Sequence, residues 1–161
     1  MTDPIPIAIR DLIASLMRSQ MLIENSYQYD MGSINEYDVA NVDDWPRTLI
    51  IPDYETAHDH EPGRDQSLYE NTLRFKIIGE WKNESSPVPG DYDPILECEK
   101  LVEDYKRFFG NYYQLADAGA FVILYAGHKK IFSNDNTYPV KVEFYVDVEY
   151  NQDRLNPSQS G

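Results

Sequence analysis

The chain has 161 residues, of which 14 are basic and 28 are acidic, and its formal net charge is −14. A surface of this sign repels phosphate backbones, so tight binding of nucleic acid is disfavoured. The single cysteine, Cys98, excludes an intramolecular disulfide, and we expect it to be a small buried side chain. Apolar runs stay well short of the ~20 residues of a membrane span, and the first residues lack the pattern of a signal peptide. We therefore expect a soluble, unexported protein without membrane contacts.

Residues 4–24 predict an amphipathic helix. Its apolar side chains recur at three- and four-residue spacing: Ile9, Leu12, Ile13, Leu16 and Ile23. Asp3 before Pro4 is the expected N-cap, and Asn25 is expected to close the helix. A helix with one apolar stripe needs an apolar surface to lie on, so we expect it to cover a sheet.

Three strand candidates follow. A short strand is expected at 34–39, a buried one at 48–52, where Pro52 would end it, and a long one at 68–81. In the long strand, apolar and charged side chains alternate. The apolar side chains are Leu73, Phe75, Ile77 and Trp81, and the charged ones are Arg74, Lys76 and Glu80. The exposed segment 55–66 would join the last two strands in a large hairpin, and such long tips often carry interaction surfaces.

A second helix and two strands complete the chain. Asp93 and Pro94 predict an N-cap and first turn, and Gly110 is expected to end the helix after Phe109. Residues 121–132 predict a strand with a bulge at Gly127. Residues 139–150 alternate without a break, which predicts an antiparallel strand with Val140, Val142, Phe144, Val146 and Val148 on its apolar face and Lys141, Glu143, Tyr145, Asp147 and Glu149 on its polar face.

This order of elements predicts an α+β fold. We expect a mainly antiparallel sheet of four or five strands, covered by two helices, with a long hairpin loop. Residues 1–150 would form a single domain, and residues 151–161 a polar C-terminal tail without an apolar face.

Signals for catalysis or for a cofactor are weak. His58 and His60, in an HDH sequence, are the only histidines that could share a metal, but their spacing fits no structural zinc pattern. Paired carboxylates are expected on exposed helix faces or loops: Asp43–Asp44, Glu97–Glu99 and Glu103–Asp104. The glycines form neither G-x-G-x-x-G nor a Walker loop. We therefore predict a protein without catalytic residues, metal or cofactor.

Taken together, the elements give the chain a resemblance to the tail terminator (tail completion) proteins of long-tailed bacteriophages. The similar segments are IAIRDLIASLMRS, DDWPRTLIIPDYE, LYENTLRFKIIGEW, the mid-chain helix and VKVEFYVDVEYNQDRLNP. The resemblance implies a hexameric ring that caps the tail tube, stops its polymerisation and meets the head-side connector or neck protein. It also implies a place in the virion, after assembly in the host cytoplasm, and a channel through which DNA passes without tight binding.

Two sets of residues are candidates for contacts in such a ring. The first is an assembly loop at the hairpin tip, with Glu55, His58, Asp59, His60, Arg64 and Asp65. The second is a ring interface on the polar face of the long strands, with Arg74, Lys76 and Tyr145. The 13 tyrosines of the chain favour protein contacts. A solvated loop and a solvated sheet face explain the same residues, and this alternative stays open.

Two other functions also stay open at this point. Within the virion, the chain could be a neck or head-completion connector protein. Outside it, the chain could be a small intracellular enzyme or ligand-binding α+β domain with its site at the 55–66 loop. A bound transition metal would favour the last alternative.

Overall fold

The computed structural model describes residues 3–31, 33–34, 45–57, 68–85, 89–115, 120–132 and 139–153. Its elements follow in the order α1 (Ile5–Gln20), the 3-10 turn η1 (Ile23–Asn25), β1 (Ser33–Ile34), β2 (Arg47–Ala57), β3 (Leu68–Trp81), α2 (Pro94–Asn111), β4 (Ala120–Ile131) and β5 (Val140–Asp153). These strands form one sheet in the order β1-β2-β3-β5-β4, in which only the short β1–β2 pair is parallel. The predicted α+β fold, an antiparallel sheet with two helices, is confirmed.

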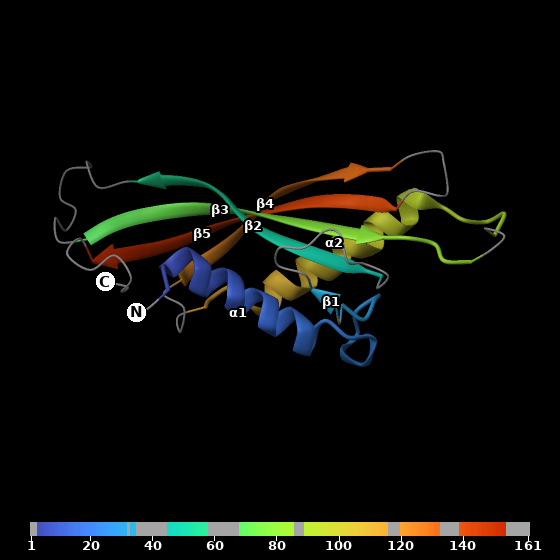
Figure 1. Cartoon of the computed structure of the whole chain (residues 1–161), viewed down its shortest axis with the longest axis horizontal. Helices are drawn as coiled ribbons and strands as arrows, with labels where there is room; N and C mark the ends of the chain where they lie inside the picture. The colour runs from blue at the N-terminus through green and yellow to red at the C-terminus, as the bar shows by residue number, and fades with distance from the viewer. Residues whose placement is uncertain are drawn as a thin grey trace.

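Both helices lie on the same face of the sheet (Figure 1), α1 against β1 and β2, and α2 against β4 and β5. Strict alternation along the strands explains this one-sided cover, because it places every second side chain on one face. On that face Leu73, Phe75 and Ile77 of β3 are buried, as are Val142 and Phe144 of β5. The predicted apolar face of residues 139–150 is therefore the part of the sheet that the helices cover.

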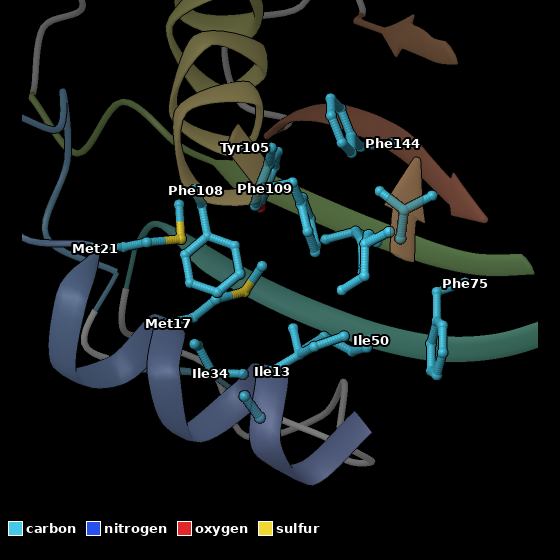
Figure 2. Packing of buried hydrophobic residues seen from close by; sticks show 14 of the residues in the cluster. Ile13, Met17, Met21, Ile34, Ile50, Phe75, Tyr105, Phe108, Phe109 and Phe144 are labelled. Atoms are coloured by element: carbon cyan, nitrogen blue, oxygen red, sulfur yellow. The ribbon is translucent and has the colours of Figure 1, made fainter. Parts of the chain in front are cut away.

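The two helices meet over this apolar face of the sheet. Figure 2 shows Met17 of α1 and Met21, the residue that follows this helix, pointing toward Phe108 of α2, while Ile13 lies near Ile50 of β2. The Phe109 ring stacks on Phe144 at a centroid distance of 6.0 Å. Burying one side chain of this size contributes about 1.5–3 kcal/mol, so the contact between the two helices and the sheet is a main source of stability.

The helix ends differ in part from the sequence prediction. The N-cap of α1 is Pro4 and makes no side-chain capping bond, so Asp3 is not the N-cap. The helix ends at Gln20, and Asn25 caps it from a distance, because its Nδ2 donates to the Gln20 carbonyl at 3.0 Å. Asp93 is confirmed as the N-cap of α2, where its side chain accepts from two backbone N–H groups.

Gly110 does not end α2. The helix continues through Gly110 to Asn111, and the N–H of Tyr112 bonds to the Phe108 carbonyl at 2.9 Å. That bond extends the last turn, so the glycine lies inside the helix and is not the residue that closes it. No heavy atom lies within 4 Å of a Cβ added at Gly110.

Two strands are longer than predicted. β2 passes Pro52 with an irregularity between Pro52 and Tyr54 and stays paired with β3 to Ala57. β5 runs to Asp153, so the first three residues of the predicted tail are paired with β3, and residues 154–161 lie outside the described ranges.

Only residue 34 of the strand predicted at 34–39 is described, in β1. The bulge at Gly127 is confirmed, and its φ of 111° explains the glycine.

Candidate functional site

The sheet face opposite the helices carries the polar half of the alternation. We call this surface the open face, because neither described helix lies on it (Figure 1). Its side chains on the long strands include Leu49, Ile51 and Tyr54 of β2, Arg74, Lys76 and Ile78 of β3, Glu143, Tyr145 and Asp147 of β5, and Leu124 and Lys129 of β4. It therefore combines charged side chains with aliphatic and aromatic ones.

Strand register places these side chains in rows across the sheet. One row joins Tyr54, Arg74, Asp147 and Leu124, which are directly opposite one another on successive strands. In the neighbouring row, Lys76 lies opposite Tyr145. Opposite residues on adjacent strands have Cβ atoms about 4.5–5.5 Å apart, so each row forms a line of contacts.

Arg74 has its charge partner within the first row. Its Nε and Nη2 donate to the two carboxylate oxygens of Asp147 at 2.8 and 3.1 Å. These bonds to Asp147, together with the nearby Asp53 carboxylate, raise the pKa of Arg74. The guanidinium also lies 6.0 Å from the centroid of the Tyr145 ring. The pair is exposed and contributes at most about 1 kcal/mol to stability, but it fixes both side chains in one orientation.

Tyr145 links the first row to the other charges of the open face. Its hydroxyl donates to Glu143 at 2.8 Å, and this bond lowers the pKa of Glu143, with a smaller effect from the positive charge of Lys76. The three residues predicted as a ring interface, Arg74, Lys76 and Tyr145, therefore lie together on one exposed face. Their contact with another subunit stays a prediction.

The predicted assembly loop is described at one residue only. Glu55 lies within β2, opposite Leu73, so it belongs to a strand and not to the loop. Its carboxylate accepts a hydrogen bond from the Tyr150 hydroxyl, and burial together with this carboxylate raises the pKa of Tyr150. The remaining five residues of the set, His58, Asp59, His60, Arg64 and Asp65, lie outside the described ranges.

Sequence reasoning missed a buried carboxylate on α2. Asp104 was expected to be exposed, but its side chain is fully buried and accepts from the backbone N–H groups of Gln28 at 2.8 Å and Tyr29 at 3.1 Å. Burial raises the pKa of Asp104 to about 6, although the two N–H bonds act in the opposite direction. Asp104 thus fastens the segment after α1 to α2.

Glu97, one turn from the start of α2, strengthens this attachment and was also expected to be exposed. Its carboxylate accepts a hydrogen bond from the Tyr29 hydroxyl and forms an ion pair with Lys100, whose Nζ lies 3.2 Å from Oε1 of Glu97. The Tyr29 ring in turn lies 6.1 Å from Trp81 of β3. The other helix carboxylates, Glu99 and Glu103, are exposed as predicted and pair with Lys130 and Arg107.

The cysteine side chain packs in the hydrophobic core. Cys98 is fully buried, as predicted, and burial raises its pKa to about 11, which keeps it a thiol. In the part of the chain that the structure describes, histidine, cysteine and carboxylate side chains form no group of three that could hold a metal ion, and the HDH residues lie outside that part. Neither described helix is long and apolar enough to cross a membrane.

Comparison of the chain with protein-family models and with curated proteins finds no match in either set.

Proposed function

We propose that this chain is a virion structural protein of a long-tailed bacteriophage, a tail terminator that forms a ring of six subunits on the tail tube. The sequence resemblance suggests this family, and one structural observation carries the proposal. The open face presents Arg74, Lys76 and Tyr145 side by side, and neither described helix lies on it. Such a face is available to a neighbouring subunit.

The composition of the open face fits a protein interface. Tyr and Arg are enriched where proteins meet, because each combines a large contact area with fixed hydrogen-bonding groups. Arg74 already has both oxygens of Asp147 as acceptors, and Glu143 has the Tyr145 hydroxyl as a donor. A neighbour can therefore cover these charges without leaving them unpaired, which is the main cost of burying a charge at an interface.

In this proposal the ring caps the tail tube, ends its polymerisation and provides the surface that the head-side connector or neck protein binds. Six copies, each with a formal charge of −14, surround the channel with excess negative charge. DNA that passes such a surface finds few cations to exchange for its counterions, so it moves through without being held.

Tube elongation in the presence of the purified chain tests the proposal. We expect the chain to bind the ends of tubes made from the tail tube protein of the same virus, in six copies per end, and to stop elongation. Tyr145→Ala should weaken this effect, whereas Tyr113→Ala, at an exposed tyrosine after α2, should leave it unchanged. Tubes that lengthen at the same rate with an excess of wild-type chain would contradict the proposal.

A further inference from the structure

The two margins of the sheet carry opposite charges. β4 is the last strand at one margin, and it contains His128, Lys129 and Lys130 but no acidic residue. At the other margin, the described part of β1 pairs only with the first two residues of β2. The following segment, 49–57, contains Asp53 and Glu55 but no basic residue. Within the strands themselves, one margin is basic and the other is acidic.

The row that crosses the sheet ends in an exposed apolar side chain at both margins. Tyr54 on β2 is 68% exposed, and Leu124 on β4 is 50% exposed. Between them, Arg74 and Asp147 form their salt bridge. A second subunit placed beside the first, in the same orientation, would bring Leu124 of one copy to Tyr54 of the other and continue the row.

Exposed charged side chains lie along both margins of the open face. Lys129 lies on the open face of β4, opposite Glu143, and Asp53 precedes Tyr54 on β2. Behind Lys129, the helix side of the margin is also basic, because Lys106 of α2 lies 5.1 Å from the centroid of the Tyr125 ring. Lys130 there is paired with Glu99, so Lys129 is the better candidate for a contact between copies.

We propose that the β4 margin of one subunit binds the β2 margin of the next copy of this chain, with Leu124 packed against Tyr54 of that copy and the basic β4 margin beside its acidic β2 margin. The inference rests on the proposed ring and identifies the element of the neighbour that meets the open face. A contact between two different margins is heterologous, and its repetition closes a ring when the rotation between neighbours allows it. Contact between two identical margins would oppose like charges.

This contact is made by side chains and not by one continuous sheet. The bulge at Gly127 distorts the edge of β4, and Pro52 removes one backbone N–H from β2. Lysines, bulges and prolines at a sheet edge all disfavour regular pairing with another strand. The charges and the two exposed apolar side chains must then supply the affinity and the direction of the contact.

A charge swap within the full-length chain tests the inference. Lys129→Glu and Asp53→Lys each reduce the opposition of charge between the two margins, and each should weaken association of the chain about threefold, as measured by sedimentation velocity over a concentration series with tail tubes present and absent. The double variant removes the like charges that Lys129→Glu creates between the margins, so it should associate more tightly than that single variant. Glu24→Lys, an exposed reversal on η1, is the control and should change little. Circular dichroism checks that each variant is folded.

Leu124→Ser and Tyr54→Ser give a second, uncharged measurement, because each removes one side of the apolar contact without adding charge. Rings that form with wild-type affinity in all four single variants would overturn this inference and leave the ring itself standing. Open chains or dimers that the reversals weaken would support the inference and contradict the ring. A wild-type chain that stays monomeric in both conditions would overturn both.

Discussion

Tyr105 on α2 packs directly against the Cα of Gly79 on β3. A Cβ added at Gly79 would lie 2.7 Å from Cε2 and 2.8 Å from Cζ of the Tyr105 ring, closer than real Cβ atoms approach other atoms. The Tyr105 hydroxyl is also hydrogen-bonded to Thr48 Oγ1 at 2.7 Å, so the buried ring cannot move without breaking that bond. The absence of a side chain at residue 79 therefore sets how closely α2 approaches the sheet.

Gly79→Ala should accordingly destabilise the protein. Overpacking of a tight core costs about 1–3 kcal/mol in the free energy of unfolding, and the lost bond to Thr48 adds to it. Urea unfolding measures the change. Gly110→Ala is the matched control, because a Cβ there has open space and the helix gains about 0.5–1 kcal/mol from the substitution. Equal stabilities of the two variants would contradict the close packing.

Asp104→Ala should loosen the segment that follows α1. The variant leaves the N–H groups of Gln28 and Tyr29 without their acceptor, at a cost of about 1–3 kcal/mol. Hydrogen exchange at these two amides should become faster than in the wild-type protein. Glu103→Ala on the adjacent exposed position removes only a surface ion pair and should change stability by about 0.5 kcal/mol or less. Unchanged exchange in the Asp104 variant would show that this attachment is absent.

The pH dependence of stability should carry a signature of Asp104. Its folded pKa, about 6, lies above the reference value of 3.8, so the folded state binds more protons between these values. Stability contributed by this group therefore rises as the pH falls from 7 to 4. The side chain introduced by Asp104→Asn cannot titrate. The free energy of unfolding of the wild-type protein minus that of the variant should therefore increase as the pH falls from 7 to 4. A difference that is constant with pH, or that decreases, would contradict the raised pKa.

Duplex DNA should not be retained by the protein or its ring. At ~0.15 M salt the Debye length is about 8 Å, so only close phosphate contacts would hold DNA, and the excess acidic residues oppose them. A gel shift with the purified chain, alone and on tail tubes, should show no bound DNA. A stable shifted band that weakens steeply with added salt would show a basic surface in the channel.

Period-two and helical patterns made much of the fold predictable. The alternation of residues 139–150 identified the buried face of β5, and the stripe containing Ile9 and Ile13 identified the inner face of α1, since burial in both cases repeats along a regular element. Arg74, Lys76 and Tyr145 could be placed on one face for the same reason. The bond from Arg74 to Asp147 required the register between β3 and β5, which the sequence does not state.

Features that depend on distant partners could not be predicted. Asp104 looks like any carboxylate on an acidic helix, and its burial follows from backbone N–H groups 75 and 76 positions away in the sequence. The turn-rich sequence around Tyr29 was the available signal for such a carboxylate, because backbone N–H groups in turns have no partner in a strand or helix and need another acceptor. Glu55 was assigned to a loop because Pro52 normally ends a strand, whereas pairing with β3 resumes after the irregularity.

The position and copy number of this chain in assembled particles test the central claim most directly. Electron microscopy of tailed particles that carry a C-terminally tagged chain would locate it, and image averaging would give its symmetry. We predict a six-fold ring at the head-proximal end of the tail tube, with a mass near six times 18.7 kDa. A single copy per particle, or a chain found away from the end of the tube, would contradict the claim.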